Sequence, residues 1–199
     1  MDTKEFRREL HRHPELSFEE HQTQRFILAS LEAEGIEARK IAGTGVLAKI
    51  EGRRGGHRRA VVLRADIDAL PIRELNEVEY RSENEGVMHA CGHDLHTTTL
   101  LGAAKLLKDH EDEICGTVKL MFQPAEEVLL GAKNMIENGI LDHPKPDAAI
   151  MIHVSADRSI GTVRLAQEGV VAPAADTFEI QVHGLACHGS VPYKGINAL

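Results

Sequence analysis

Short runs of apolar residues alternate along the chain with stretches in which an apolar residue recurs every three or four positions. Residues 60–63 form a continuous apolar run bounded by charge, as expected for a central strand buried on both faces. Residues 117–122 and 148–152 are two further runs that predict buried strands. Between the runs, residues 95–108 and 131–138 show helical spacing. This alternation of strand and helix predicts an α/β fold with a parallel sheet.

Two helices are predicted ahead of this pattern. Residues 2–13 are charged, with two apolar residues four positions apart, and Pro14 ends the helix that they predict. Residues 17–20, Ser-Phe-Glu-Glu, have the form of a capping box. We therefore expect a second helix from this point to Gly35.

A hairpin is predicted next. Residues 36–41 and 46–50 are rich in β-forming residues and flank Gly43-Thr44-Gly45. This Gly-Thr-Gly is too short for a phosphate-binding loop, so we interpret it as a structural turn.

The character of the sequence changes near residue 172. Residues 161–166 and 176–182 predict two more strands, the second with the alternation of a half-exposed strand. We therefore expect one domain over residues 1–172 and the beginning of a second over residues 173–199.

Composition narrows the class of protein. Among 199 residues, 42% are hydrophobic, which is enough for a core, and the formal charge of −8 argues against nucleic acid or an anionic membrane as a partner. No apolar run approaches the roughly 18 residues of a membrane span, and residues 1–9 are too charged for a signal peptide. Three cysteines without framework spacing fit a reducing compartment. We expect a cytoplasmic protein.

Residues 89–96, His-Ala-Cys-Gly-His-Asp-Leu-His, concentrate side chains that bind divalent metals. Cys91 and His93 can turn toward one centre, or straddle two, only if the backbone bends sharply at Gly92. A Cys-x-His pair alone is a weak signal, because a free cysteine is often a small buried hydrophobe. Its position at the start of a predicted helix strengthens the metal hypothesis.

Further candidate ligands follow the predicted strands. Asp66 and Asp68 lie just after the first buried strand, and the carboxyl ends of strands are where open α/β sheets bind ligands. Glu126 and Glu127 follow the second strand and His153 the third. Each also has an ordinary interpretation: loop-capping carboxylates, a solvated helix start and a structural histidine. Their coincidence at strand ends favours a site.

Two adjacent acids point in different directions on almost any backbone. One of Glu126 and Glu127 can therefore bind a metal while the other accepts a proton from water and passes it to a leaving amine. That division of labour is what metal-assisted hydrolysis requires.

With these residues in view, the chain resembles the M20 metallopeptidase family, in particular its amidohydrolase subfamily of aminoacylase, hippurate hydrolase and indoleacetyl-amino-acid hydrolase type. The resemblance rests on residues 11–18 (HRHPELSF), 43–45 (GTG), 63–71 (LRADIDALP), 87–94 (VMHACGHD) and 122–127 (FQPAEE). It implies a three-layer zinc-peptidase-like catalytic domain and the start of a smaller α+β lid or dimerisation domain.

The resemblance also implies a metal-dependent hydrolase that cleaves the amide bond of N-acylated amino acids with two divalent ions, which could be zinc, manganese, cobalt or nickel. Cys91 would bridge the metals, and His93, Glu127 and His153 would each bind one of them. Glu126 would be the general base and acid.

Two further roles follow from the same resemblance. Asp68 would orient a ligand imidazole. His188 would reach the active site of a partner subunit from the lid and polarise the substrate, so the full-length form is expected to be a homodimer.

The sequence departs from the family pattern in three respects. Family members are about twice as long and carry a last metal-binding histidine that this chain lacks. Cys187 stands where glycine is usual, and Tyr193 where histidine is common. These differences put the substrate contacts and the activity of the isolated chain in question.

Two alternatives stay open at this point. Cys91 could be a nucleophile beside His93 or His96, although no oxyanion-hole motif accompanies it. The chain could instead be an inactive metal-binding remnant that serves as an interaction module.

Overall fold

The computed structural model describes residues 2–56, 59–166, 168–170, 174–176 and 178–198. The chain divides into two compact units, Met1–Ala156 and Asp157–Leu199. The elements of the first unit are α1 (Thr3–Arg12), α2 (His21–Ala33), β1 (Ala38–Ile41), β2 (Gly45–Glu51), β3 (Arg59–Asp66), α3 (His93–Asp109), β4 (Gly116–Gln123), α4 (Gly131–Glu137) and β5 (Ala148–Met151). The domain boundary at residue 172 stays a prediction.

The sheet of the first unit is mixed. Its strand order among the described residues is β1-β2-β4-β3-β5. The pairs β1–β2 and β2–β4 are antiparallel, whereas β3–β4 and β3–β5 are parallel. The predicted α/β class is confirmed, but the expectation of a mostly parallel sheet needs correction. The N-terminal hairpin adds two antiparallel strands to a parallel group of three.

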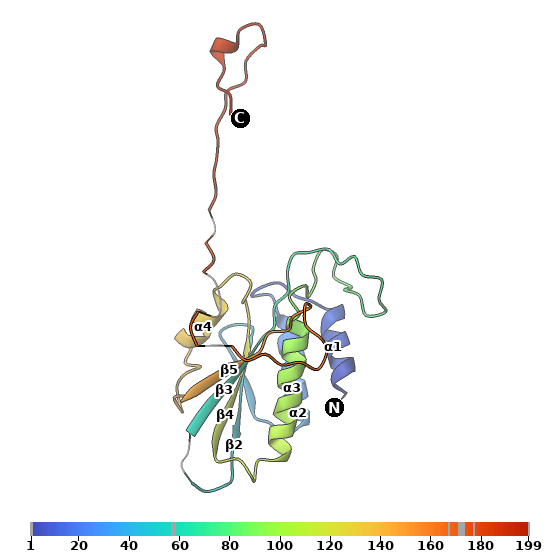
Figure 1. Ribbon diagram of the computed structural model, residues 1–199, viewed down its shortest axis with the longest axis vertical. Helices are drawn as coiled ribbons and strands as arrows, with labels where there is room; N and C mark the ends of the chain where they lie inside the picture. Colours follow the sequence, from blue (N-terminus) through green and yellow to red (C-terminus); the bar gives the residue numbers. More distant parts are fainter. Residues whose placement is uncertain (1, 57–58, 167, 171–173, 177, 199) are drawn as a thin grey trace. The chain divides into compact units, whose positions relative to one another are not determined.

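Helices α1, α2 and α3 lie on one side of this sheet, and α4 lies on the other (Figure 1). α2 contacts β1 and β2, α3 contacts β3 and β4, and α1 packs on α3. The short α4 contacts β4. The predicted three-layer arrangement is therefore seen in part, because one layer consists of a single helix of two turns among the described residues.

The main core lies between the sheet and α2 and α3. Leu101 and Ala104 of α3 and Phe122 of β4 are fully buried there, as is Ile27 of α2. Each large apolar side chain buried in this way stabilises the fold by about 1.5–3 kcal/mol. This packing fixes the start of α3 against the ends of β3 and β4.

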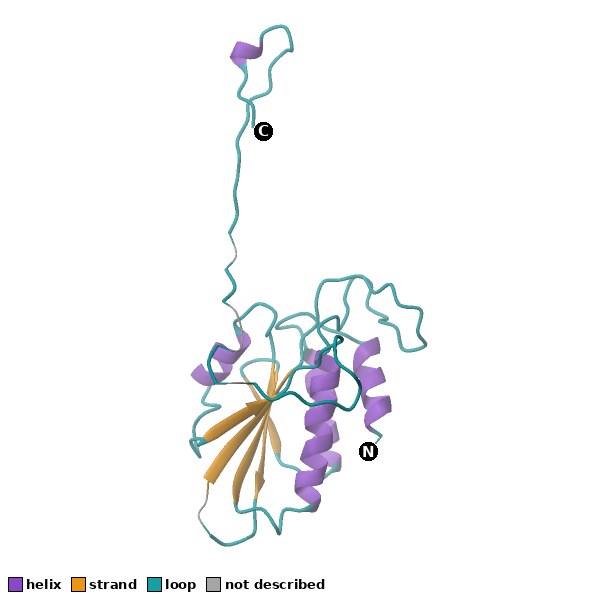
Figure 2. Ribbon diagram, viewed as in Figure 1, coloured by secondary structure: helices purple, strands orange, loops and turns teal. Residues whose placement is uncertain are grey.

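The three parallel strands β3, β4 and β5 run side by side in one direction (Figures 1 and 2), so their carboxyl ends lie at the same end of the sheet. Asp66, the last residue of β3, is in register with Gln123, the last residue of β4. β5 ends at Met151, two residues before His153. α3 begins at His93. The expectation that these residues meet at the carboxyl ends of the strands is confirmed.

β5 was predicted to be buried, and this prediction is wrong. Ile150 and Met151 are 56% and 67% exposed. β5 is the edge strand of the sheet and pairs only with β3 among the described residues. An apolar run identifies a strand, but it does not tell which side of the strand the rest of the fold covers.

The capping box predicted at residues 17–20 is also wrong. The N-cap residue of α2 makes no side-chain capping bond. The Glu15 carboxylate instead accepts hydrogen bonds from the main-chain N–H groups of Gln22, at 2.9 and 3.0 Å, and Thr23, at 2.9 Å. The Ser17 hydroxyl donates to Asp68 Oδ2 at 2.7 Å. Ser17 thus serves the candidate site and not the helix.

The second unit has little regular structure. The strands predicted at 161–166 and 176–182 are absent from its described residues, which form a bridge between Leu185 and Ile196 and a 3₁₀ helix, Pro192–Lys194. Phe178 is 82% exposed. A strand is stable only with a partner, and this stretch pairs with none among the described residues. No helix in the described part of the chain is both long and apolar enough for a membrane span.

A buried ion-pair cluster joins α1 to α3. His11 Nδ1 lies 2.7 Å from Asp94 Oδ2, and His11 Nε2 lies 3.1 Å from Glu74 Oε1. Carboxylate oxygens only accept hydrogen bonds, so both contacts are hydrogen bonds when both His11 nitrogens carry a proton. Burial lowers the pKa of His11, but the hydrogen bonds to Asp94 and Glu74 raise it more, so the pKa lies above its ordinary value. The two carboxylates therefore favour the imidazolium form of His11.

We expect His11→Asn to lower the free energy of unfolding most at acid pH. A raised folded-state pKa contributes stability that is complete below pH 6.5, the ordinary value, and is lost as the pH rises through the folded pKa. The difference between wild type and variant should therefore shrink as the pH increases, as measured by urea unfolding. His13→Asn is the control, because His13 is partly exposed. A difference that grows with pH would contradict the assignment.

Candidate metal centre

Gly92 provides the bend that places Cys91 and His93 on one site. It adopts φ +86°, in the left-handed region that favours glycine. A Cβ at this position would lie 2.5 Å from Val154 Cγ2. The glycine therefore allows both the turn into α3 and the close approach of the segment that carries His153.

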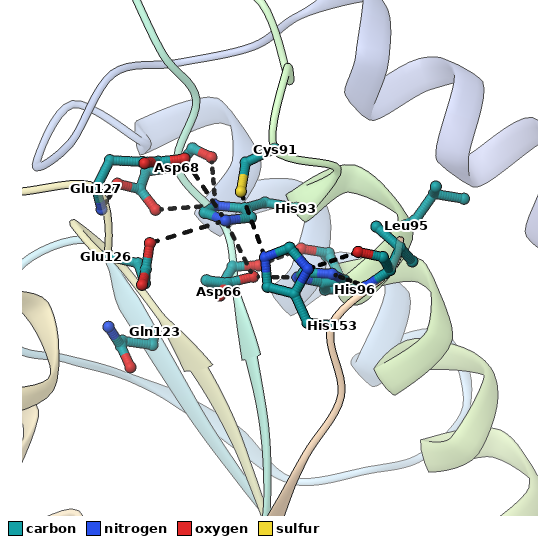
Figure 3. A network of polar contacts seen from close by, with 12 residues as sticks. Asp66, Asp68, Cys91, His93, Leu95, His96, Gln123, Glu126, Glu127 and His153 are labelled. Atoms are coloured by element: carbon teal, nitrogen blue, oxygen red, sulfur yellow. Dashed lines mark hydrogen bonds and ion pairs between the residues drawn. The ribbon is translucent and has the colours of Figure 1, made fainter. Parts of the chain in front are cut away.

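Glu126 and Glu127 lie in a tight turn directly after β4. The preceding Ala125 is fully buried and has φ +50°, which is uncommon for a residue other than glycine. The main-chain N–H of Glu127 donates to Asp68 Oδ2 at 3.0 Å. Both glutamates reach toward His93 (Figure 3), with carboxylate oxygens 3.9 and 3.7 Å from His93 Nε2.

His93 has the tautomer of a metal ligand. Its Nδ1–H donates to the main-chain carbonyl of Asp68 at 2.9 Å, which leaves the lone pair on Nε2. Nε2 is buried and has no hydrogen-bond partner among the residues that the structure describes, and the same is true of Glu127 Oε1. A lone pair surrounded by carboxylate oxygens is unfavourable unless a cation lies between them.

In metal-free protein, a proton can occupy the position between His93 Nε2 and the carboxylate oxygens. Burial lowers the pKa of His93, but the hydrogen bond to Asp68 and the charges of Asp66, Asp68 and Glu127 raise it more. The site is therefore built to attract positive charge.

His153 repeats the arrangement of His93. Its Nδ1–H donates to the main-chain carbonyl of Val154 at 2.6 Å, and its Nε2 lies 3.4 Å from Cys91 Sγ. A histidine that donates one ring N–H to a carbonyl and turns the other nitrogen to a thiol is arranged as metal-binding histidines are.

The donor separations fit divalent metal ions. From zinc bond lengths and tetrahedral angles, two donors on one zinc ion lie roughly 3.3–3.6 Å apart. Cys91 Sγ and His153 Nε2 are 3.4 Å apart, and His93 Nε2 and Glu127 Oε1 are 3.7 Å apart. Two groups of three residues have metal-ligand spacing: Cys91–His93–His153 and His93–Glu126–Glu127. Within each group, the donor atoms lie within 4.8 Å of one another. His93 belongs to both groups.

His96 lies close to these ligands but has no lone pair to offer. Its Nδ1 donates to Asp66 Oδ1 at 2.5 Å, and its Nε2 accepts the main-chain N–H of Val154 at 2.9 Å. Although Asp66, His93 and His96 also form a group with metal-ligand spacing, both nitrogens of His96 are engaged. His96 thus anchors the segment next to His153.

Asp68 connects the two sides of the site. Its side chain is buried and accepts hydrogen bonds from Ser17 and from the main chain of Glu127, while Oδ1 lies 3.3 Å from His93 Nδ1. Burial raises the pKa of Asp68, but the hydrogen bonds from His93, Ser17 and the main chain lower it more. An ionised Asp68 fixes the tautomer of His93 and the direction of the Glu127 backbone.

The thiol of Cys91 is not prepared for nucleophilic attack. Burial and the charges of Glu127, Asp66 and Glu126 raise its pKa to about 12. The thiolate is the nucleophilic form of cysteine, and reactive cysteines lie in electropositive surroundings. The carboxylates around Cys91 therefore argue against the cysteine-nucleophile alternative, whereas a metal ion would favour the thiolate.

The structure brings six of the seven predicted site residues together in the first unit: Asp68, Cys91, His93, Glu126, Glu127 and His153 (Figure 3). His188 belongs to the second unit, where its Nδ1 is 2.9 Å from Ser190 Oγ. Its proposed contact with a partner subunit stays a prediction.

Sequence reasoning missed Ser17 and His96. Both lie inside motifs that were noticed, but Ser17 was assigned to a helix cap. His96 belongs to the predicted metal-binding stretch 89–96, but the sequence gives it no role of its own in the metal site. The spacing of three residues between His93 and His96 along a helix was the signal that both rings share one face.

Comparison with known proteins agrees with these motifs. The profile of a family described as peptidase family M20/M25/M40 matches residues 62–189. N-acetyl-L-cysteine deacetylase of Bacillus subtilis is 46% identical over 194 residues, which are 97% of this chain and 45% of the relative. N-acyl-L-amino acid amidohydrolase of Geobacillus stearothermophilus is 41% identical over 196 residues, 98% of this chain and 52% of the relative.

A solved structure extends the likeness to the fold. The Bacillus subtilis YXEP protein, described as a dinuclear metal-binding peptidase of the M20 family, aligns with a TM-score of 0.74 at 43% identity, over 78% of this chain and 43% of that one. The chain spans about half the length of the curated relatives it matches.

The resemblance predicted from the motifs is thereby confirmed. The family profile covers more than half of the chain, and the stretches that carry the site residues lie within or beside it. The chain belongs to peptidase family M20/M25/M40.

Proposed function

We propose that the protein is a metal-dependent hydrolase that cleaves the amide bond of N-acylated amino acids. The observation that carries the proposal is the matched geometry of His93 and His153. Each donates Nδ1–H to a main-chain carbonyl and turns Nε2 toward Cys91 or Glu127. The substrate class comes from the amidohydrolases and deacetylases to which the chain is similar.

Cys91, His93, Glu127 and His153 would hold two divalent ions. Zinc, manganese, cobalt and nickel all suit this mixture of thiolate, imidazole and carboxylate. When bound, such ions supply Lewis acidity, which activates water and polarises an amide carbonyl. Dinuclear metal binding is described for the YXEP relative, which supports this stoichiometry.

Glu126 would act as the general base and acid. Its side chain is 33% exposed, whereas that of Glu127 is 18% exposed, so Glu126 is the more open to water. A carboxylate here can take the proton of the attacking water and hand it to the nitrogen of the leaving amine. Asp68 would keep His93 and Glu127 in place during both proton transfers.

The remaining parts of the proposal concern the whole protein. We place the catalytic domain within residues 1–172, as part of a three-layer fold, and the start of a lid or dimerisation domain within residues 173–199. His188 would polarise the substrate in the active site of a second subunit of a homodimer. We propose a cytoplasmic location, with small N-acylated amino acids as substrates and neither nucleic acid nor membrane as a partner.

A panel of N-acetyl and N-benzoyl amino acids tests the proposal. The full encoded protein, loaded with Zn²⁺, Mn²⁺, Co²⁺ or Ni²⁺, should release the free amino acid, as detected by reaction of the new amine. Activity should disappear on chelation and return when metal is added. Metal binding without hydrolysis of any member would favour the alternative of an inactive metal-binding module. Full activity in chelator would contradict the proposal.

A further inference from the structure

Glu20 is a buried carboxylate that the proposed chemistry does not use. It lies at the start of α2 with a relative exposure of 0%, and it has no ion-pair partner among the described residues. Its Oε1 accepts the main-chain N–H of Ala125 at 2.8 Å, and its Oε2 accepts the hydroxyl of Thr44. A buried carboxyl group is costly unless its oxygens are hydrogen-bonded, and these two bonds engage both of them.

One of the two partners belongs to the turn that carries the candidate catalytic acids. Ala125 is itself fully buried and has φ +50°, a conformation that alanine adopts only when its surroundings impose it. The turn is too tight for any side chain at Gly131, where a Cβ would lie 1.6 Å from the carbonyl oxygen of Pro124. The Ala125 carbonyl accepts the Gly131 N–H at 3.0 Å. Glu20 accepts the main-chain N–H of the same residue, so both main-chain groups of Ala125 are hydrogen-bonded.

The second partner of Glu20 is Thr44, which gives the Gly43-Thr44-Gly45 turn a role. Thr44 is 2% exposed, and its hydroxyl points to Glu20. The side-chain amide of Gln24, one turn along α2, donates to the carbonyls of Gly43 and Gly45 at 2.9 and 3.0 Å. The hairpin turn is thus tied to α2 in the position that presents Thr44 to Glu20.

We propose that Glu20 is a positioning residue that acts through Ala125. It holds the side chains of Glu126 and Glu127 in the orientations that the proposed chemistry requires. Thr44 orients the Glu20 carboxylate for this task. The inference rests on the proposed function for the roles of Glu126 and Glu127, but the positioning itself is a property of the chain. Burial raises the pKa of Glu20, and the bonds from Thr44 and Ala125 oppose that rise, in agreement with their geometry.

The test compares four variants of the full encoded protein with wild type. Glu20→Leu and Thr44→Val remove the two interactions, while Glu20→Gln keeps an oxygen acceptor for Ala125 and Thr44→Ser keeps the hydroxyl. Lys119→Met is the control for general loss of stability. Lys119 is fully buried and donates to carbonyls of Ile140 and Asp142, away from the site.

Two readouts do not depend on turnover: hydrogen exchange of the amides of residues 125–127 in metal-free protein, and the dissociation constant for Zn²⁺ in a chelator competition. Glu20→Leu and Thr44→Val should speed the exchange and weaken Zn²⁺ binding by about 10–100-fold, as loss of an orienting partner typically does. Thr44→Ser should match wild type, and Glu20→Gln should recover much of the loss. In turnover, kcat should fall while KM changes little.

Unchanged exchange and unchanged Zn²⁺ affinity in folded Glu20→Leu would overturn the proposal. If that variant does not fold, Thr44→Val decides in the same way. An equal loss of affinity in Lys119→Met would also overturn it, since the effect would then be one of general stability. If wild type binds Zn²⁺ but hydrolyses no substrate, the proposed function fails, and exchange and affinity still judge the role of Glu20.

Discussion

Glu126→Gln is expected to lower kcat for N-acyl amino acid hydrolysis by about a hundredfold to ten-thousandfold, the usual contribution of a positioned general base. Glutamine keeps the shape of the side chain but cannot accept a proton. Metal content should stay at the wild-type level, because the ligands proposed here are Cys91, His93, Glu127 and His153. Steady-state kinetics together with elemental analysis of the same sample measure both quantities.

The matched control is Glu85→Gln, the same change at an exposed carboxylate paired with Arg73. It should leave kcat and KM unchanged. If Glu126→Gln retained half of the wild-type turnover with full metal content, Glu126 would not be the base. If the variant lost its metal, its role would be that of a ligand.

His93→Ala is expected to have the largest effect on metal binding. His93 is 1% exposed, and its Nε2 lies within reach of donor atoms in both candidate metal groups. Its loss should weaken Zn²⁺ binding by more than the roughly 10–100-fold that removal of an orienting partner costs. Isothermal titration of the chelator-treated protein gives the affinity and the number of ions.

His96→Ala is the matched control that separates loss of a metal ligand from loss of a supporting histidine. The ring centroids of His93 and His96 are 5.4 Å apart, and both side chains are buried. Both ring nitrogens of His96, however, form hydrogen bonds within the protein. Its loss should therefore stay within the smaller range, through looser anchoring of Val154 and His153. Equal loss of affinity in the two variants, or a greater loss in His96→Ala, would show that the tautomers were assigned incorrectly.

Local sequence patterns predicted much of the fold, because adjacent residues decide it. The hairpin of β1 and β2, the strands β3 and β4 and the helix α3 all lie within a few residues of their predicted bounds. In each case, an apolar run or a helical repeat is buried against a neighbour close in sequence or in the sheet. The bend at Gly92 was predicted for the same reason.

Features decided by distant parts of the chain were not predictable. The exposure of β5 depends on which strands pair with it, and the cap of α2 comes from Glu15 and not from Ser17. Lys119 interrupts the apolar run of β4, yet it is fully buried. Its ammonium group donates to main-chain carbonyls of residues 140, 142 and 144, which are far from Lys119 in the sequence.

In the candidate site, too, some features are predictable from local sequence and others depend on distant parts of the chain. Residue types and motif spacing predicted Cys91, His93, Glu126, Glu127 and His153 as candidate site residues, because few side-chain types bind metals or transfer protons. Which nitrogen of each imidazole carries the proton depends on carbonyls and carboxylates brought in by the fold. The supporting hydrogen bonds to the site could therefore be found only in the structure.

The proposed chemistry depends on divalent metal ions bound by Cys91, His93, Glu127 and His153. Crystals of the protein grown with Zn²⁺ and measured on both sides of the zinc absorption edge test it most directly. We expect anomalous peaks within bonding distance of Cys91 Sγ, of Nε2 of His93 and His153, and of the carboxylate of Glu127. Absence of peaks at these atoms, or an ion held instead by Asp66 and His96, would contradict it.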